Sequence, residues 1–564
     1  MKLSRRSAAL VVAGVGGYLV CAILPDWLRV VSRNYVPRWF ERAAIDVFFQ
    51  AMQALFVLVM AIAPLAAAFA AVRLGYGRRR GYSVSWSARM LICSCTLLVL
   101  ALVCEIGARY ALHRQPALPG PTTLADGPGN SIDFAVVGES TAAGWPYAPS
   151  ISIAQIVAWQ LEQLLPGRRV RLDMQAVQAG SCLDQMIPHL RRLPFRPDVV
   201  LVCAGHNEFQ TRYGWPRRPW YADSRPPAAG ALQHACRFSN LLSFFNQQID
   251  RNQIDALPED VYRRQMVDCP CCTPAEYSAV LDNYRHQLEA LADWCDKLDA
   301  LLIVVTPPSN LGSFPPNRSY LAATASAAER EAFRRDFLAA CSREEQSPGE
   351  AEPDFRRLLA EQPLFAESHF RLARMLERQG KFDEAELHFS RARDLDGMPL
   401  RCPTDFAAAA NEVCRRHPRA LWVDGSDVFR RLSPHGIADD HLMHDAQHPK
   451  LRGYIELAKE VLDQLRARRA LGLPEGVAPP VQLSQCVEHF GIERSHWEQA
   501  CTLSAQFYEA VAGLRYAPDV LLRRSEDYRA AARRIAAGDR PEEVEVLGLA
   551  SWSDRPAAGN GRSD

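Results

Sequence analysis

The sequence has almost no excess charge of either sign. Its 564 residues carry 65 Lys and Arg against 64 Asp and Glu, which gives a formal net charge of +1. A protein that binds nucleic acid through the phosphates carries a basic patch or a strongly basic domain, and this balance offers no electrostatic argument for one. We therefore expect no nucleic-acid partner.

Patterns typical of metal sites are also missing. The stretch DCPCCTP, residues 268–274, holds three of the sixteen cysteines, yet no second Cys-x-x-Cys and no suitably spaced His pair accompanies it. The histidines His441, His444 and His448 lie close together without the His-Glu-x-x-His pattern of a metalloprotease. We expect no metal and no cofactor.

The cysteines could form disulfides instead if the domain is extracytoplasmic. The candidates are Cys236, Cys269, Cys271, Cys272 and Cys295.

The long apolar runs gather near the N-terminus. They cover residues 8–24, 47–72 and 90–104. The second is long enough to cross a bilayer with some tilt, and the third is short but is extended by EIGARYAL. A cleaved signal peptide explains the first run less well, because no small-x-small cleavage site follows it. We predict three transmembrane helices within residues 1–113.

The distribution of Lys and Arg predicts the orientation of these spans, because cytoplasmic loops are enriched in both. The N-terminal tail carries three and the loop between the second and third runs carries five, whereas the loop between the first and second carries four. This difference places the N-terminus in the cytoplasm and everything after about residue 110 outside it. If the third run is a buried helix instead, two spans leave the large domain in the cytoplasm.

Beyond a Pro- and Gly-rich linker at 114–130, apolar segments of strand length alternate with helical patterns. The candidate strands are 131–137, 169–177, 197–204, 300–306 and 420–424. Continuously apolar strands that alternate with helices indicate a parallel sheet covered on both faces. The sequence therefore predicts a three-layer α/β/α fold.

A helical insertion lies between the fourth and fifth candidate strands. Residues 366–396 form two amphipathic patterns on either side of Gly380, and this unit resembles one tetratricopeptide repeat. Its small residues are Ala373, Ala385 and Ala392, and its predicted buried stripe is Leu372, Phe382, Leu387 and Phe389. A single repeat cannot bury its apolar face alone, so we expect it to pack on the α/β domain or to bind a protein partner.

These patterns divide the chain after the linker. The predicted boundaries are 131–319 and 401–475 for the α/β domain, 320–400 for the insertion, 476–550 for a C-terminal helical region and 551–564 for a disordered tail.

The stretch VVGESTAAG exposes Ser140 at the end of the first candidate strand. Ligands bind at the carboxyl ends of parallel strands, so Ser140 is a candidate nucleophile. A hydrolytic serine needs a base, a group that orients the base, and donors for the developing oxyanion. Asp445 and His448 are three residues apart, which would place them on one face of a helical turn. Gly180 and Asn207 follow the second and third candidate strands.

Four short blocks of the sequence resemble those of the SGNH, or GDSL-type, hydrolases in their usual order. They are Gly138-Glu139-Ser140, Gly180, Gly205-His206-Asn207-Glu208 and Asp445-x-x-His448. The resemblance implies that Ser140 is the nucleophile, His448 its base and Asp445 the residue that orients the base. It also implies an oxyanion hole made of the Ser140 and Gly180 amides and the Asn207 side chain. The implied reaction is the hydrolysis of an ester through an acyl-enzyme.

The sequence departs from the family pattern at two acidic positions. Glu139 and Glu208 stand where the family usually has Asp, so we expect altered geometry around the site rather than lost chemistry. For His206 we expect a place in the wall of the substrate pocket.

Further stretches resemble a bacterial, membrane-anchored subgroup of this family that carries tetratricopeptide repeats within the hydrolase domain. They are GHNEF (205–209), TPPSNLGSFPP (306–316) and RARDLDGMPLRCP (391–403). The resemblance implies an inner-membrane protein whose extracytoplasmic domain acts on a cell-envelope carbohydrate or lipid. Two alternatives stay open: an O-acyltransferase that uses the same triad, and a scaffold that binds a partner through the repeat.

Overall fold

The structure is a computed structural model. It describes residues 129–210, 270–272, 274–476, 479–512 and 518–549, together with single residues between 66 and 118. Several stretches lie outside these residues. They are the first apolar run, most of the second and third runs and of the linker, the tail at 551–564, and the cysteines Cys236 and Cys269. Within the described part of the chain, no helix is both long enough and apolar enough to cross a membrane.

The chain divides into two compact units. One comprises Met1–Pro116 and Ala222–Glu259, and the other comprises Ala117–Tyr221 and Asp260–Asp564. All helices and strands with bounds given below belong to the second unit.

The second unit is built around a parallel sheet. Its strands are β1 (Ser131–Gly138), β2 (Arg169–Val177), β3 (Val199–Cys203), β4 (Leu301–Thr306) and β5 (Ala420–Asp424). They pair in the order β2-β1-β3-β4-β5, and each of these pairs is parallel. The predicted parallel α/β sheet is confirmed, and each strand begins and ends within two residues of its predicted position.

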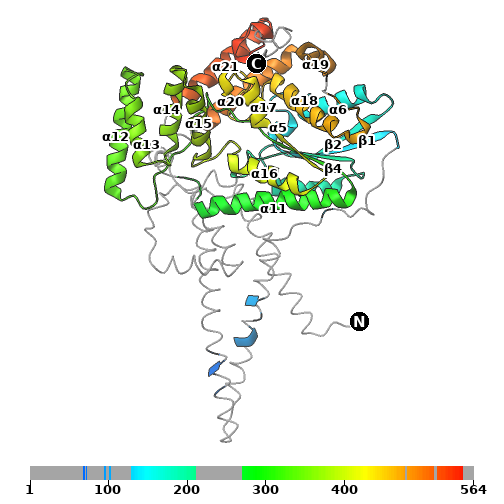
Figure 1. Ribbon diagram of the computed structural model, residues 1–564, viewed down its shortest axis with the longest axis horizontal. Helices are drawn as coiled ribbons and strands as arrows, with labels where there is room; N and C mark the ends of the chain where they lie inside the picture. Colours follow the sequence, from blue (N-terminus) through cyan, green and yellow to red (C-terminus); the bar gives the residue numbers. More distant parts are fainter. Residues whose placement is uncertain are drawn as a thin grey trace, which may run out of the picture. The chain divides into compact units, whose positions relative to one another are not determined.

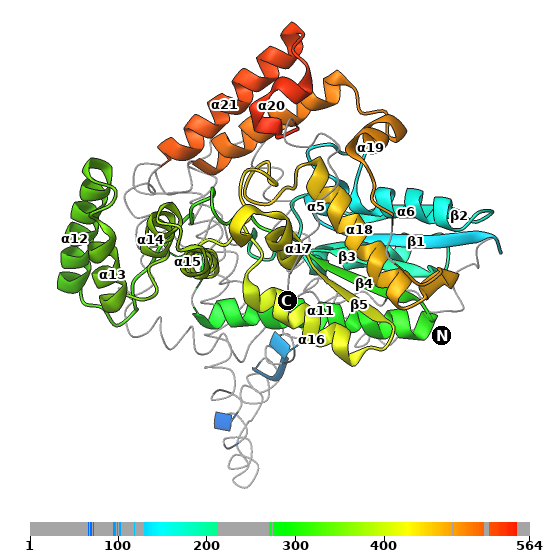
Figure 2. The ribbon, with the colours of Figure 1, turned by 45° about the horizontal axis from the view of Figure 1, so that its top comes forward.

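Helices cover both faces of the sheet because the strands are apolar on both sides. Phe134 of β1 enters one hydrophobic core, whereas Val137 of the same strand enters a second core on the opposite face, as the pleat requires. Helices α6 (Ile153–Leu164) and α18 (Leu451–Ala467) pack on the first face. Helices α11 (Pro274–Leu298) and α16 (Thr404–Arg416) pack on the second face (Figure 1 and Figure 2).

The carboxyl ends of β1, β2 and β3 meet at one edge of the sheet. Gly138, the last residue of β1, lies opposite Val177 in β2 and Cys203 in β3. The strands β2 and β3 flank β1 on opposite sides, and open parallel sheets bind ligands in the crevice beside such a reversal of strand order. The segments that leave these three strands therefore converge on one place.

The C-terminal region is helical, as predicted, and contains α19 (Leu483–His489), α20 (Arg494–Ala512) and α21 (Asp519–Ala537). Helices α20 and α21 pack against each other, and their tyrosines Tyr508 and Tyr528 join the core over the first face of the sheet. The remaining short helices, with η marking 3₁₀ helices, are α5 (Ser140–Ala143), α7 (Leu183–Met186), η3 (Ile187–Arg192), α17 (Gly425–Leu432), η6 (Pro434–Gly436), η7 (Ala470–Gly472), η8 (Pro541–Glu543) and η9 (Glu545–Leu547).

The segment between β4 and β5 contains a group of four helices that precede α16. They are α12 (Ala327–Gln346), α13 (Glu352–Glu361), α14 (Ala366–Arg378) and α15 (Phe382–Asp394). Helices α14 and α15 meet at Gly380, whose φ of 76° lies in the left-handed region that favours glycine. Their hydrophobic core also takes in Leu311 and Ile437 from loops of the α/β domain. The group therefore packs on that domain.

The buried face of α15 differs from the predicted one at a single residue. Ala385, Phe389 and Ala392 are buried, with the spacing of three and four residues that defines one helical face. Leu387 is 51% exposed because it lies two residues from both Ala385 and Phe389, on the other side of the helix. The prediction that Leu387 is buried is wrong.

Three of the cysteines considered for disulfides are described, and all three carry free thiols. Cys271, Cys272 and Cys295 are buried in the core over the second face of the sheet. Burial raises the pKa of the Cys295 thiol, so it stays protonated and packs as a small apolar side chain.

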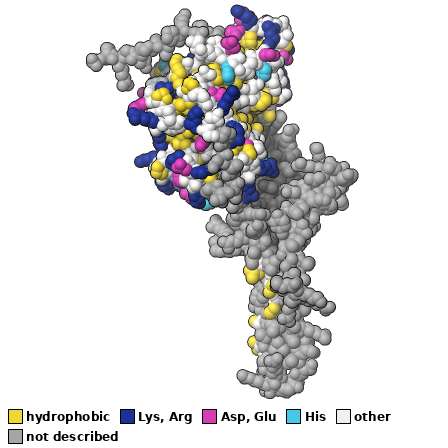
Figure 3. Space-filling model, turned by 90° about the vertical axis from the view of Figure 1, so that its right-hand side faces the viewer, with side chains coloured by type: hydrophobic (Ala, Val, Ile, Leu, Met, Phe, Trp, Pro, Cys, Tyr) yellow, Lys and Arg dark blue, Asp and Glu magenta, His cyan; other side chains and the backbone are white. Residues whose placement is uncertain are grey.

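Acidic and basic side chains are interspersed on the surface of the described residues. Figure 3 shows Lys and Arg beside Asp and Glu on one face, with hydrophobic side chains between them. Ion pairs join some of these groups, as where Arg356 contacts both Glu352 and Glu384. The near-zero net charge thus reflects local mixing of the two signs on this face.

Two glycines with nearly the same backbone conformation should respond differently to substitution. Gly144 has a φ of 87°, and a Cβ there would lie 1.6 Å from the Ile151 carbonyl oxygen. Gly167 has a φ of 88°, with no atom within 4 Å of the corresponding position. We expect Gly167→Ala to lower the free energy of unfolding by about 1 kcal/mol and Gly144→Ala to lower it by about 3 kcal/mol or more. Urea unfolding followed by near-UV circular dichroism measures both, and equal losses would contradict the steric argument.

Candidate active site

Ser140 stands at the end of β1, where the chain turns sharply into α5. Gly138 permits this turn, because a Cβ there would lie 2.3 Å from the Ala142 Cβ and 2.5 Å from the Cys203 carbonyl oxygen. The turn leaves Ser140 partly exposed, with its Oγ 2.7 Å from Nε2 of His448.

His448 is held on its other side by a buried carboxylate. Its Nδ1 lies 2.9 Å from both carboxylate oxygens of Asp445, and both residues are buried. An ionised carboxylate can only accept hydrogen bonds, so we assign the proton to Nδ1 of the neutral imidazole. Nε2 is then an acceptor for the Ser140 hydroxyl, and the three side chains form one continuous hydrogen-bonded chain.

The segment that carries this pair is a closed loop, so the predicted helical turn is wrong. Met443 and Pro449 form an antiparallel bridge, and the His444 amide donates to the His448 carbonyl at 2.8 Å. Asp445 Oδ1 also accepts from the amide of His448 at 3.0 Å, so the carboxylate closes the loop while it contacts the imidazole. Pro449 cannot continue a helix from the preceding residues, which favours this conformation.

A second polar contact fixes the loop from outside. Asn310, fully buried, donates its side-chain amide to the Asp445 carbonyl at 3.2 Å and to the Asp440 carboxylate at 2.8 Å. Its backbone amide donates to the Ala446 carbonyl at 3.1 Å. The position of Asp445 therefore depends on a residue in the segment that follows β4.

The predicted oxyanion donors lie at the ends of the three converging strands. Ser140 follows β1, Gly180 follows β2 with a φ of 80°, and Asn207 follows β3. A Cβ on Gly180 would lie 3.1 Å from Nε2 of Gln210, whose backbone amide donates to the Asn207 carbonyl. Within the described residues, the Ser140 and Gly180 amides and the Asn207 side chain donate to no protein acceptor. All three groups are thus available to a ligand.

Glu139 and Glu208 point inward and bind backbone. The Glu139 carboxylate accepts from the amides of Gly205 at 2.7 Å, His206 at 3.0 Å and Asn207 at 3.0 Å. Complete burial raises the pKa of Glu139 to about 7, and these hydrogen bonds oppose the rise.

The Glu208 carboxylate accepts from the Leu183 amide at 3.0 Å. This hydrogen bond connects the segment after β3 to the segment after β2.

His206, which we expected in the wall of the substrate pocket, is almost completely buried. Only 1% of it is exposed, and its Nδ1 accepts from the Cys402 amide at 2.9 Å. Burial lowers the pKa of His206 to about 3, so the imidazole is neutral at ordinary pH. It is part of the contact between the segment after β3 and the chain that returns from the insertion.

His444 is buried between tyrosines. Its Nε2 lies 2.6 Å from the hydroxyl of Tyr147, and its Nδ1 lies 3.5 Å from the hydroxyl of Tyr528. Burial lowers the pKa of His444 well below its ordinary value. Among the described residues, no three or more His, Cys, Asp or Glu side chains are grouped so that they could hold a metal ion.

Two aromatic rings form walls beside the candidate base, and sequence reasoning did not anticipate either. The Trp145 ring centre lies 4.1 Å from that of His448, and Phe507 of α20 meets the same imidazole edge-on at 5.6 Å. Both rings are partly exposed. The amphipathic pattern of α20 indicated a helix, but nothing in it indicated which edge of the sheet the helix would reach.

No protein-family model matches this sequence, and no curated protein matches it significantly. The arrangement of Ser140, His448 and Asp445 has to be interpreted from its own geometry.

Burial of His206 should make the protein sensitive to acid. The ordinary pKa is 6.5 and the folded one about 3, so between these values the unfolded chain binds a proton that the folded chain does not. This group therefore stabilises the fold fully above pH 6.5 and loses that effect as the pH falls, by up to about 1.4 kcal/mol per pH unit.

The variant His206→Asn tests this effect, because asparagine Oδ1 lies where the imidazole Nδ1 lies, can still accept from the Cys402 amide, and takes up no proton. We expect its free energy of unfolding to fall less steeply than that of the wild type between pH 6.5 and pH 4. Urea unfolding across this range gives both slopes. Equal slopes would show that His206 is not the group responsible.

Proposed function

We propose that this protein is a serine esterase of the SGNH hydrolase type. The observation that carries the proposal is the hydrogen-bonded chain from Ser140 through His448 to Asp445, in which the serine and the histidine are 308 residues apart. Three donors with no protein acceptor at the neighbouring strand ends are what an oxyanion would need. The strand order, which matches the flavodoxin-like arrangement, is in keeping with the proposal.

In the first step, Ser140 Oγ attacks the ester carbonyl carbon while His448 Nε2 takes the hydroxyl proton. Asp445 holds the proton on Nδ1 and stabilises the imidazolium that forms. The negative charge on the former carbonyl oxygen is stabilised by the Ser140 and Gly180 amides and the Asn207 side chain. His448 then protonates the departing alkoxide, and an acyl-enzyme remains on Ser140.

In the second step, His448 removes a proton from water, which attacks the acyl carbon. The tetrahedral intermediate is stabilised by the same donors, and it collapses with return of the proton to Ser140 Oγ. The acid is released and the serine is free again. No metal or cofactor takes part in this scheme.

The setting of the reaction is part of the same proposal. The apolar runs at 8–24, 47–72 and 90–104 would anchor the chain in a bacterial inner membrane, with the α/β domain on the extracytoplasmic side. A cell-envelope carbohydrate or lipid ester would be within reach there. The helix pair α14 and α15 would offer a surface to a protein partner.

Labelling with a fluorophosphonate probe tests for an activated serine. We expect the full-length protein to be labelled, and Ser140→Ala and His448→Ala to lose the label. Ser278→Ala, on α11, is the matched control and should be labelled like the wild type. A folded wild type that takes no label would overturn the proposal.

The carboxylate of Asp445 should act on the rate of ester hydrolysis. Asp445→Asn should lower kcat for p-nitrophenyl acetate by about 10⁴-fold, because it removes the carboxylate that fixes the tautomer of the base.

The side chain of Asn207 should act on the rate and not on stability. Its amide donates to no protein acceptor in the described chain, so Asn207→Ala should leave the melting temperature nearly unchanged. We expect kcat for p-nitrophenyl acetate to fall by about 10² to 10³ with little change in KM, because the lost contact forms in the transition state. A loss confined to KM would contradict a role in the oxyanion hole.

A further inference from the structure

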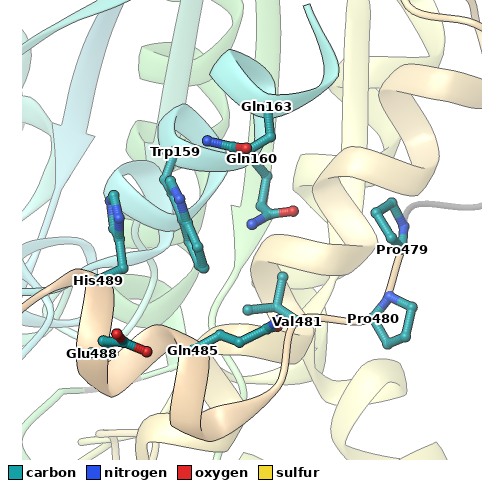
Figure 4. A pocket seen from close by; sticks show the side chains of 9 residues that line it. All are labelled: Trp159, Gln160, Gln163, Pro479, Pro480, Val481, Gln485, Glu488 and His489. Carbon is teal, nitrogen blue, oxygen red and sulfur yellow. The ribbon is translucent and has the colours of Figure 1, made fainter.

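A polar cavity lies between α6 and the segment that leads into α19, away from Ser140, His448 and Asp445. Its volume is about 500 Å³, which is in the range of small-molecule sites. The lining residues, shown in Figure 4, are Trp159, Gln160, Gln163, Pro479, Pro480, Val481, Gln485, Glu488 and His489. None of them belongs to the candidate active site, so ligand binding here does not depend on the proposed esterase activity.

Trp159 presents one face of its indole ring to the cavity. His489 stacks against the ring at 4.3 Å between centres and 13° between planes, and Phe490 meets it edge-on at 5.7 Å. Figure 4 shows His489 on one side of the indole and Gln160 on the other. Because neighbouring rings fix the indole, its remaining face is a rigid apolar surface in the cavity.

Gln160 supplies a polar group with no protein partner. Only 7% of the residue is exposed, and its side chain makes no hydrogen bond within the described part of the chain. It points into the cavity beside Trp159 (Figure 4). Its amide atoms are absent from the buried, unsatisfied polar atoms of the described residues, so they are reached from the cavity itself. A ligand in the cavity could therefore pair with them.

Two further primary amides surround the same space. Gln163 is exposed on α6, one helical turn beyond Gln160. Gln485 uses its Oε1 to accept from the Gln482 amide at 3.2 Å, which leaves its NH₂ group for another acceptor. The cavity therefore combines one aromatic face with three amides.

The chemistry of this lining selects a class of ligand. A primary amide both donates and accepts, as a hydroxyl group does, and the negative face of an indole attracts the weakly positive C–H bonds on one side of a sugar ring. No Lys or Arg lines the cavity to hold an anion, and Glu488 is the only carboxylate among the lining residues that could hold a cation. We propose that this cavity binds a neutral pyranose sugar, stacked on Trp159 and hydrogen-bonded to Gln160.

The position of the cavity relates sugar binding to the candidate active site. Helix α6 begins after the turn that carries Ser140, and Trp159 lies six residues from its first residue, a rise of about 9 Å. A glycan bound at Trp159 would be held on the helix that leads away from the nucleophile. The site would then anchor a carbohydrate chain while other parts of it remain free.

Saturation-transfer NMR on the full-length protein tests the proposal. The probes are the methyl pyranosides of glucose, galactose, mannose and N-acetylglucosamine, with choline as the competing cationic ligand. A polyoxyethylene detergent is required, because alkyl maltosides would present sugar headgroups of their own. We expect the ring protons of at least one pyranoside to receive saturation, and Trp159→Ala and Gln160→Leu each to weaken its binding at least tenfold.

Gln160→Leu separates a binding role from a structural one. It removes, at nearly constant volume, an amide that bonds to no other group in the described chain, so it should leave the melting temperature nearly unchanged while it weakens sugar binding. Gln287→Leu is the matched control, since Gln287 is a buried glutamine on α11 outside the cavity, and it should bind sugar like the wild type. Absence of saturation with every pyranoside overturns the proposal, as does binding that survives both cavity variants or a response to choline alone.

Discussion

A single buried carboxylate holds together the strand ends on which the candidate site is built. Glu139 leaves β1 one residue before Ser140 and accepts hydrogen bonds from three successive amides after β3, including that of Asn207. The amides of Gly205 and Asn207 have no other protein acceptor among the described residues, so removing the carboxylate would leave these two buried and unpaired. Burial disfavours the charged form of Glu139 and raises its pKa. Glu208 makes a similar connection, because its carboxylate accepts from an amide in the segment after β2.

The helical insertion between β4 and β5 does not disturb this site, because a hydrogen bond joins the segment before its first helix to the segment after α15. Asp396, just after α15, accepts from the amide of Asn317, which precedes α12. Arg401 then donates to the carbonyl of Asn310, whose side chain donates in turn to the carbonyl of Asp445. A long segment between β4 and β5 can therefore be accommodated without separating the strands, and its base contacts the loop that carries His448.

The sequence predicted most of the sheet because the signals of the strands are local, whereas the partners of the serine came from the resemblance of four separate blocks to a known family. Continuous apolar runs gave the five strands, and Gly138 and Gly180 marked turns at their ends. Features that depend on packing between distant segments could not be predicted this way. Phe507 reaches His448 only because α20 folds back over the first face of the sheet, and Gln160 looks like an ordinary polar residue of α6 until the segment before α19 covers it. The Asp445 loop differed from the predicted helical turn because the bridge between Met443 and Pro449 closes it, while Asn310, a residue from a distant segment, contacts it from outside.

The long separation between Ser140 and His448 has a consequence for the newly made chain. A ribosome that adds roughly 5 to 20 residues per second needs about 15 to 60 s to pass from the serine to the histidine. During that interval Ser140 lacks the imidazole that it contacts in the folded protein, and the ring of Phe507 has yet to be added. If Ser140 is the nucleophile that we propose, a nascent chain or a truncated product that ends before His448 would not react with esters through this contact.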